Sequence, residues 1–244
     1  SSTGGKSIQV TTEKFNHSSF DWMSGSDGFV FSSNYTEDWE YDFRNSEIYS
    51  ISVNGSNLQK LTDRNGPDMG AAVSPDGKSI AYLGYEDKVQ TYQINNLTIM
   101  DIDGSNKRTI NIDLDRNIES LKWSADGKNL YFMYDNYGNT KIATTNLTGR
   151  VRKLIDDVGG TSIGRPYGGG SFSVSSEGEI SYTLTSPYHP ADIGYYEGNS
   201  FKRLTNLNND LFRGKDLGVI EEIWYNSSVD GRKIQGWIAK PPGF

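Results

Sequence analysis

The sequence predicts an all-β protein built from repeated four-stranded units, because two turn motifs recur in step along it. The first motif places an acidic residue and a glycine between two strand-like runs, as in Ser74-Pro75-Asp76-Gly77-Lys78. Its four glycines are Gly28, Gly77, Gly127 and Gly178, so successive copies lie 49, 50 and 51 residues apart. A fixed spacing of this size is typical of repeat architectures.

The second turn motif joins a polar or acidic residue to a glycine, ahead of a basic strand. Its glycines are Gly5, Gly55, Gly104, Gly149 and Gly198. Glycine supplies the positive φ that tight hairpin turns require, and Asn or Asp tolerates the neighbouring position. Each repeat therefore carries two hairpins, which together make four short strands.

The strands between these turns alternate in polarity, as in Glu47–Val53 and Leu97–Ile102, which indicates two differently packed faces. About 50 residues with four such strands fits one blade of a β-propeller. Blades are expected at 18–62, 68–112, 117–156 and 169–206, and residues 1–12 are expected to be the outer strand of a preceding blade. A long β-sandwich is the alternative, although it would not explain two turn motifs locked to one period.

Composition narrows the classes of function. The 244 residues carry a net charge of −7, which disfavours nucleic acid and anionic membrane surfaces as partners. Cysteine is absent, so disulfide and thiolate chemistry are excluded. The two histidines, His17 and His189, are far apart in sequence, and no metal site or cofactor is expected. The opening Ser1–Gly5 has no secretory signal character, so the chain is expected to begin inside a longer protein, with a cytoplasmic location favoured.

The repeat pattern stops after Thr205. Residues 206–218 are polar, and residues 219–244 read as two strands around an Asp230-Gly231 turn, closed by Pro241-Pro242-Gly243. This hairpin does not match the blade template. The expected division is therefore a propeller portion at 1–214 and the start of another domain at 215–244. The alternative is an irregular hairpin that closes the propeller.

The residues of this junction carry a family resemblance. Glu-Glu-Ile-Trp-Tyr at 221–225, Asp-Gly-Arg-Lys-Ile-Gln-Gly-Trp-Ile at 230–238 and Lys-Pro-Pro-Gly-Phe at 240–244 resemble the junction in the prolyl oligopeptidase superfamily. The acylaminoacyl peptidases and related dipeptidyl peptidases are the most similar branch. The segments at 74–82 and 165–172 resemble that family's blades, although TolB-like propellers use the same turn, so the junction is the more specific part.

The resemblance implies a seven-bladed propeller ahead of an α/β-hydrolase domain whose first piece is this hairpin. Only four complete blades and one strand are visible here, and the hydrolase would follow Phe244. No Gly-x-Ser-x-Gly nucleophile motif occurs, and both histidines are expected in loops, so no catalytic residue is assigned. The expected role is to gate short peptides to a serine peptidase. The alternative is a TolB-like protein-interaction module without hydrolase activity.

Two segments are candidates for substrate binding. Residues 36–43 mix acids with aromatics, and Glu37, Asp38, Trp39 and Tyr41 could hold a cationic group such as a peptide N-terminus. Related dipeptidyl peptidases use propeller glutamates in this way, but from a motif that leads into an inner strand, whereas this one leads into an outer strand. The role is therefore not carried over, and a solvated acidic loop pinned by Trp39 and Tyr41 is the alternative.

The second segment, 164–170, leads into the innermost strand of the fourth blade. Arg165 and Tyr167 are its candidates for holding a carboxylate or carbonyl. A buried arginine that satisfies loop carbonyls is the alternative. The expected partners are the C-terminal hydrolase domain, short peptides and, through exposed blade edges, other copies of the chain.

Overall fold

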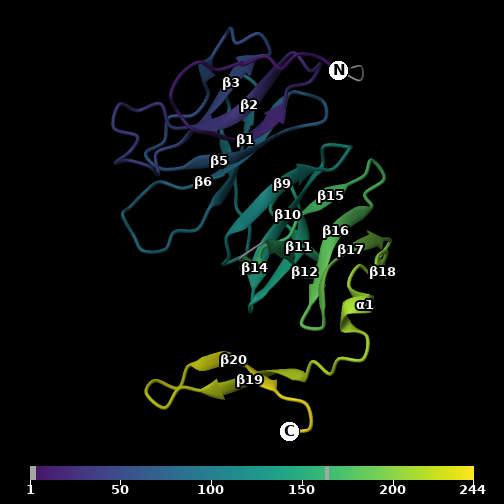
Figure 1. The fold of residues 1–244 in the computed structure, drawn as a ribbon. Helices are drawn as coiled ribbons and strands as arrows, with labels where there is room; N and C mark the ends of the chain where they lie inside the picture. The colour runs from purple at the N-terminus through teal and green to yellow at the C-terminus, as the bar shows by residue number, and fades with distance from the viewer. Residues whose placement is uncertain (1–3, 163–164) are drawn as a thin grey trace. The chain divides into compact units, whose positions relative to one another are not determined.

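The first two blades form separate four-stranded antiparallel sheets, as the computed structural model of residues 4–162 and 165–244 describes them (Figure 1). The first comprises β1 (His17–Trp22), β2 (Gly28–Ser33), β3 (Glu47–Ser52) and β4 (Gln59–Lys60). The second comprises β5 (Asp68–Val73), β6 (Ser79–Gly84), β7 (Asn96–Asp101) and β8 (Arg108–Ile110). Strands follow sequence order in both sheets. The predicted all-β fold class is confirmed.

The third and fourth blades share one sheet. The third comprises β9 (Ile118–Trp123), β10 (Asn129–Asn136), β11 (Asn139–Asn146) and β12 (Val151–Val158). The fourth comprises β15 (Phe172–Val174), β16 (Ile180–Ser186), β17 (His189–Glu197) and β18 (Ser200–Arg203). Because β12 runs for eight residues, its last residue, Val158, pairs with Leu184 of β16 and joins the two sheets.

The remaining elements lie before and after the fourth blade. A small hairpin, β13 (Gly160–Ser162) and β14 (Arg165–Gly168), precedes the fourth blade. One helical turn, α1 (Asn209–Phe212), lies in the segment expected to be loop, and β19 (Val219–Asn226) pairs with β20 (Lys233–Lys240) as the expected C-terminal hairpin. The chain divides into two compact units. The first holds blades one and two with most of the third, and the second holds most of the fourth, residues 135–141 and the C-terminal hairpin.

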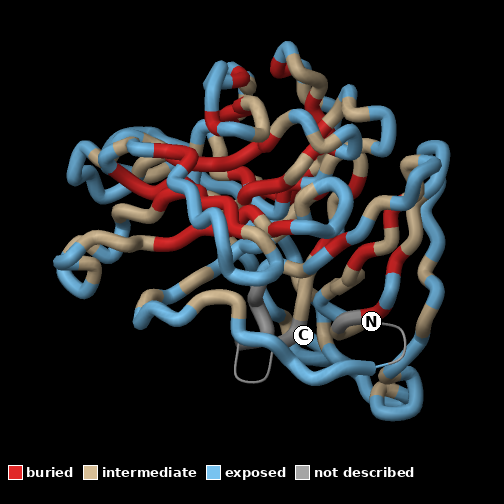
Figure 2. The backbone as a smooth tube through the Cα atoms, turned by 90° about the horizontal axis from the view of Figure 1, so that it is seen from above, coloured by how far each residue is buried: buried red, intermediate tan, exposed pale blue. Residues whose placement is uncertain are grey.

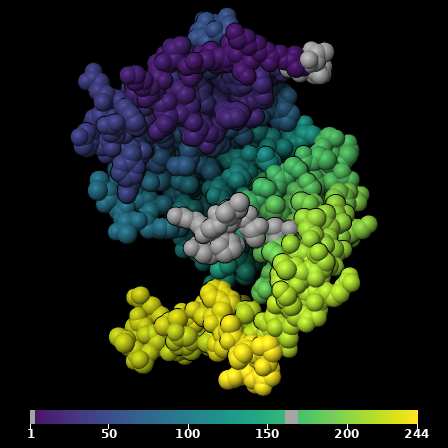
Figure 3. All heavy atoms as spheres, in the orientation of Figure 1, coloured from purple at the N-terminus to yellow at the C-terminus, as the bar shows by residue number. Residues whose placement is uncertain are grey.

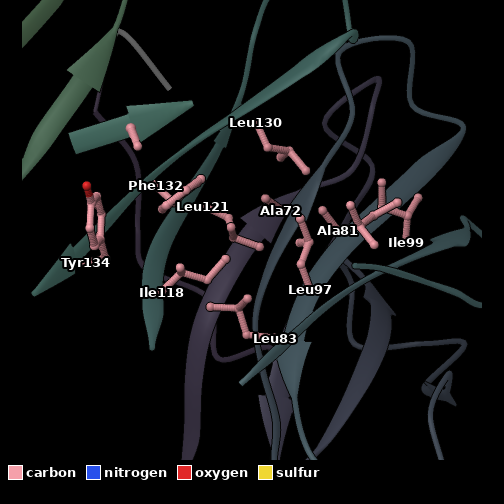
Figure 4. Close-up of a cluster of buried hydrophobic side chains, with 12 residues drawn as sticks. Ala72, Ala81, Leu83, Leu97, Ile99, Ile118, Leu121, Leu130, Phe132 and Tyr134 are labelled. Carbon is pink, nitrogen blue, oxygen red and sulfur yellow. The ribbon is translucent and has the colours of Figure 1, made fainter. Parts of the chain in front are cut away.

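The core of the first unit lies between the apolar faces of its blades. Side chains of the second blade, including Leu83 and Leu97, pack with Ile118, Leu121 and Phe132 of the third in one buried cluster (Figure 4). Buried residues are red in Figure 2. Both faces of β7 are buried, since Leu97 and Ile99 belong to this cluster and Met100 belongs to a second one. Each fully buried Leu, Ile or Phe contributes roughly 1.5–3 kcal/mol to folding, so this packing is the main force that stacks the blades.

The inner turns are held by the residues that define the first motif. Ser74 Oγ donates to Asp76 Oδ1 at 2.6 Å, and the same carboxylate oxygen accepts from Lys78 N at 3.1 Å. Ser124 and Asp126 repeat the first of these bonds at 2.6 Å in the third blade. The serine hydroxyl, followed by the backbone N–H, lowers the pKa of each aspartate. The Ser-x-Asp-Gly pattern is thus a hydrogen-bonding unit as well as a conformational one.

In the first blade the turn residue is Ser26 rather than Gly28. Ser26 has a φ of 58°, in the left-handed region where Gly77 lies at 70°. Gly28 instead opens β2, where a Cβ would lie 2.7 Å from the carbonyl oxygen of Ile51, so a side chain is excluded for packing reasons. Counted from Ser26, the inner turns are 51, 50 and 51 residues apart, which is more regular than the glycines suggest.

The outer turns are the points where one blade meets the end of the blade before it. A Cβ on Gly104 would lie 2.9 Å from the carbonyl oxygen of Leu61, and one on Gly149 would collide with the carbonyl of Asn111. Both glycines have φ near 90°. At Gly104 and Gly149 the second motif therefore needs glycine for its positive φ and for this close backbone approach, whereas a Cβ on Gly198 of the fourth blade would have open space around it.

Residues 4–12 form no strand, which corrects the expectation for residues 1–12. They lie beside the first blade, where a Cβ on Gly55 would be 2.6 Å from the carbonyl oxygen of Val10. The backbone of Val10 thus approaches Gly55 as closely as the backbone of Leu61 approaches Gly104. The segment takes the position of a preceding blade's end without the hydrogen-bonded ladder that defines a strand.

A threonine clamp fastens the outer strand of the first blade. Thr62 Oγ1 accepts a hydrogen bond from Ile48 N at 2.9 Å and donates one to Glu47 Oε2 at 2.7 Å, while Lys60 Nζ pairs with Glu47 Oε1 at 2.7 Å. Thr62 and Glu47 are buried. The fourth blade repeats the clamp with Thr205, Ile193 and Asp192.

Replacing Thr62 with Val should lower the free energy of unfolding by about 1–3 kcal/mol, because a buried carboxylate loses its donor and a backbone N–H loses its acceptor. Thr62→Ser keeps the hydroxyl and is the matched control. Urea unfolding followed by circular dichroism measures both. Equal losses in the two variants would place the cost in the missing methyl group rather than in the clamp.

Candidate functional site

A cavity of about 500 Å³ lies at the end of the first blade where β1 begins and β2 ends. The loop at 34–46, which connects β2 to β3, supplies one side of it, and the start of β5 with the residues around it supplies another. The lining residues are Asn16, Ser18, Ser19, Ser32, Ser33, Asn34, Trp39, Glu40, Phe43, Arg44, Ser46, Pro67, Met69 and Tyr85. Its walls combine hydroxyl and amide groups with aromatic rings, the mixture that binds small polar ligands.

The loop has a defined shape. Asn34 Oδ1 accepts from the backbone N and the hydroxyl of Thr36 at 3.1 and 2.7 Å, and Asn34 Nδ2 donates to the carbonyl of Asp42 at 2.7 Å. The backbone N–H groups of Tyr41 and Asp42 both donate to the carbonyl of Asp38. One asparagine thus ties the two ends of a single helical turn, which presents the intervening side chains in fixed directions.

Aromatic contacts position Trp39. Its ring meets Phe15 edge-on at 6.3 Å between centroids, and Phe15 packs on Tyr35 at 4.7 Å, which in turn packs on Tyr49 at 4.8 Å. Each such pair contributes about 0.5–1.5 kcal/mol beyond its buried area. Trp39 is therefore held half-buried with its ring at the cavity.

Among the candidates from the sequence, the structure places only Trp39 in the cavity wall. Glu37 and Asp38 are exposed beside it, and Tyr41 is 87% exposed. Arg165 and the nearby Tyr167 lie in β14, and their side chains fall outside the described part of the chain. The binding roles of these residues stay predictions.

Sequence reasoning missed most of the cavity. Glu40, Phe43 and Arg44 come from the same loop, and Arg44 stacks over the Phe43 ring at 5.5 Å. Ser32 comes from β2, and its Oγ is buried without a hydrogen-bond partner among the described residues. An aligned comparison of the strand ends in the four repeats would have pointed to this loop, because the tight turn at 137–138 is the same connection in the third blade.

Both histidines begin strands, which corrects the expectation that they lie in loops. His17 Nδ1 lies 3.0 Å from Ser33 Oγ, which itself donates to the carbonyl of Asn16 at 2.9 Å. The hydroxyl proton is therefore directed away from the imidazole, so Nδ1 carries a proton and donates to the serine. This is the reverse of the bond that a histidine base makes to a serine nucleophile.

Within residues 4–162 and 165–244, no group of three His, Asp or Glu side chains is arranged to hold a metal ion. In the same ranges, no helix has the length and apolar character that a membrane crossing requires.

The C-terminal hairpin has two unlike faces. Cross-strand pairing places Glu222, Trp224, Gln235 and Trp237 on one face, here termed the docked face. Gln235 Nε2 donates to the carbonyl of Tyr137 at 3.0 Å, and the Trp224 ring meets the Tyr137 ring edge-on at 5.4 Å. The docked face thus contacts the β10–β11 turn of its own unit.

The opposite face, here termed the open face, is mainly apolar. Its side chains come from seven residues, and Gly236 adds none: Val219, Glu221, Ile223, Tyr225, Ile234, Ile238 and Lys240. Val219 is 51% exposed and Ile238 40%, and the hairpin appears as part of the yellow surface in Figure 3. Glu221 and Lys240 form an ion pair at 2.7 Å at its edge.

Comparisons with known proteins agree with these features. Dipeptidyl-peptidase 5 from Arthroderma otae is 29% identical over 220 residues, which cover 82% of this chain and 28% of the relative. The acylaminoacyl peptidase of Pyrococcus horikoshii superposes with a TM-score of 0.65 at 20% identity, over 91% of this chain and 32% of that one. A putative TolB from Agrobacterium tumefaciens superposes with a TM-score of 0.58 at 18% identity, over 77% and 64%. No family model matches.

The chain is similar to the propeller portion of a prolyl oligopeptidase-type peptidase. The resemblance inferred from the junction is therefore confirmed. This peptidase-associated propeller spans about 28% of the length of the curated relatives that it matches. The TolB likeness concerns the fold, which propellers of different function share.

Replacing Tyr35 with Phe should raise the free energy of unfolding of this propeller by about 1 kcal/mol. The Tyr35 hydroxyl is buried without a hydrogen-bond partner among the described residues. Burial, and then the Glu13 carboxylate and Tyr49, raise the pKa of Tyr35 to about 12. Removing an unsatisfied buried hydroxyl recovers its desolvation cost while the ring contacts persist.

Urea unfolding at pH 7 measures the effect of Tyr35→Phe. Tyr35→Leu is the control, because it removes the ring contacts as well and should lower stability. A loss of stability in Tyr35→Phe would mean that the hydroxyl makes a favourable bond in solution.

Proposed function

We propose that this chain is the substrate-gating propeller of a serine peptidase that cleaves short peptides, with the catalytic residues in a C-terminal α/β-hydrolase domain. The hairpin with one docked face and one open face is the observation that carries the proposal. It fits a division into a propeller portion at 1–214 and the first strands of the hydrolase at 215–244.

The docked face explains how the two domains are joined. Glu222 Oε1 accepts from Trp224 Nε1 at 2.7 Å and from Gln235 Nε2 at 2.9 Å, so one carboxylate orders two side chains of the face. On the blade side, Tyr137 has a φ of 53° and is followed by Gly138, over which Trp237 packs. Tyr188 adds a further link, because its hydroxyl accepts from Ile220 N at 3.1 Å.

The open face supports a partner on its other side. Five of its seven residues are apolar or aromatic, and the hairpin by itself has too little core to be stable. A two-stranded ribbon with apolar side chains on both faces is typical of the edge of a larger sheet. A C-terminal hydrolase domain would supply that sheet, and the greater length of the relatives supports its presence in this protein.

The cavity of the first blade is proposed to receive the peptide. The loop at 34–46, which lines the cavity, is the connection between the second and third strands of its blade. Residues 36–44 carry four carboxylates and one guanidinium, so they favour a cationic group. Trp39 would pack on the peptide, with Glu37, Asp38 and Tyr41 at the rim.

Arg165 and Tyr167 of β14 are proposed to bind the other end of the peptide. A short peptide carries an ammonium group at one end and a carboxylate at the other. A propeller that selects peptides by their length needs a contact for each end. Arg165 suits the carboxylate, since a guanidinium forms paired hydrogen bonds with it, and Tyr167 suits a peptide carbonyl.

Replacing Trp39 with Ala should weaken binding of a short peptide with a free N-terminus about tenfold, the loss expected for one aromatic contact to a cation and its neighbouring groups. Isothermal titration of the chain with a tripeptide amide and its N-acetylated form measures this. Tyr41→Ala is the matched control from the same loop, because Tyr41 lies outside the cavity.

Three results would count against the proposal. Equal binding by wild type and Trp39→Ala would exclude the cavity as the peptide site. Hydrolysis of chromogenic peptides by the chain alone would overturn the assignment of catalysis to another domain. A propeller that binds folded proteins but no peptides would favour the TolB-like interaction module.

Replacing Gly138 with Ala should release the hairpin from its blade. A Cβ at this position would lie 2.5 Å from Trp237 Cη2, so the ring must move. Tryptophan fluorescence should shift to longer wavelength as Trp237 is released, and trypsin should cleave faster after Arg232 or Lys233. Gly127→Ala is the control, because Gly127 also has a positive φ of 67° but open space around a Cβ. Equal effects in both variants would point to backbone strain instead of docking.

A further inference from the structure

One buried position, at the start of the inner strand, is occupied by different residue types in different blades. The inner strands β1, β5 and β9 begin at His17, Asp68 and Ile118, which are 51 and 50 residues apart. Ile118 packs in the apolar cluster between blades, as its place in a repeat predicts. Asp68 is fully buried, with an exposed fraction of 0%. Since the third blade is built with isoleucine here, the blade geometry itself does not require an acid.

Asp68 also lies where the first blade is joined to the second. Its backbone N donates to the carbonyl of Ser46 at 2.7 Å, and Ser46 Oγ donates to the carbonyl of Asp68 at 3.2 Å. These bonds tie the start of β5 to the segment before β3. Residues 61–68, which run between the two blades and end at this point, are here termed the joint.

The carboxylate of Asp68 is incompletely satisfied. Arg64 Nη2, from the joint, lies 2.9 Å from Oδ1, but neither carboxylate oxygen has a partner with hydrogen-bond geometry among the described residues. Oδ1 is pressed against Gly84, where no side chain would fit. A buried charge with one imperfect partner is costly, whereas the neutral acid is much less so.

Charged and titratable groups face Asp68 from every neighbouring element. Arg64 comes from the joint, Glu47 from β3, Lys107 from the residue before β8, and Tyr82 from β6. Burial raises the pKa of Asp68 to about 6 and the Glu47 charge adds to the rise, against the opposing effects of Arg64, Thr62 and Lys107. The Arg64 cation thus lowers the pKa of Asp68 by less than burial raises it.

We propose that Asp68 makes the joint between the first and second blades responsive to pH, closing it most firmly when the carboxyl group is protonated. The neutral acid fills the position as the isoleucine does in the third blade. The ionised acid is better satisfied by solvent or by a fuller contact with Arg64, and opening of the joint would provide either one. The same position thus carries a titrating side chain, Asp68, in the second blade and a non-titrating one, Ile118, in the third.

The direction of the pH effect follows from linkage. The folded-state pKa of Asp68 lies above the ordinary value of 3.8, so the folded chain binds more protons than the unfolded chain between pH 3.8 and about 6. The stabilising contribution is complete below pH 3.8 and is lost as the pH rises through about 6. Between pH 5 and pH 7.5 the closing equilibrium of the joint should fall about tenfold.

Hydrogen exchange measured by mass spectrometry on the whole chain tests this, after correction for the intrinsic rate at each pH. Peptides that cover the joint and the start of β5 should lose about tenfold in protection between pH 5 and pH 7.5. In Asp68→Asn the loss should be absent. Peptides that cover Ile118 at the start of β9 are the internal control, because that position has no titrating group.

Two further variants keep the test decisive if Asp68→Asn folds poorly. Asp68→Ile installs the side chain of the third blade and should give high protection at both pH values. Arg64→Gln removes the cation, so the midpoint of the protection loss should move to higher pH. The same pH dependence in wild type and Asp68→Ile, or no dependence in wild type, would overturn the proposal.

Discussion

The architecture of this chain depends on how closely the outer turn of one blade approaches the backbone at the end of the blade before it. At Gly104 and Gly149 that approach leaves no room for a Cβ, and the positive φ there excludes most side chains independently. The contact is between backbones, so it is insensitive to the side chains around it. It therefore fixes the step between blades, while the apolar faces supply most of the energy that holds them.

Much of the fold could be predicted because the two turn motifs are local hydrogen-bonding units. Asp76 and Asn54 each accept bonds from the backbone two residues ahead, so the hydrogen bonds of these turns are formed within the motif itself. The predictions that were wrong concern contacts between residues far apart in the sequence. Gly28 imitates the turn glycine, although its constraint is the carbonyl of Ile51 on the neighbouring strand, and the link between Val158 and Leu184 leaves no trace in the motifs.

The candidate site was predicted only in part, for a similar reason. A loop rich in acids and aromatics signals binding, but its composition does not say which side chains turn inward. Trp39 lines the cavity because Phe15, upstream of the first strand, holds its ring, whereas Tyr41 two residues on points to solvent. Ser32 and Tyr85 belong to strands or their ends and look like ordinary scaffold until the blades are assembled.

A repeat protein offers its own internal comparison, and here that comparison separates scaffold from function. Where the repeats agree, as in the threonine clamps of Thr62 and Thr205, the residues satisfy backbone and buried acids of the blade itself. Where they differ at equivalent places, the blade geometry is met either way and the difference needs another explanation. The connection between second and third strands is a thirteen-residue loop beside a cavity in the first blade and a tight turn against the hairpin in the third. Positions where the repeats differ are therefore where a propeller can carry a specific function, because changing the residues there leaves the spacing between blades intact.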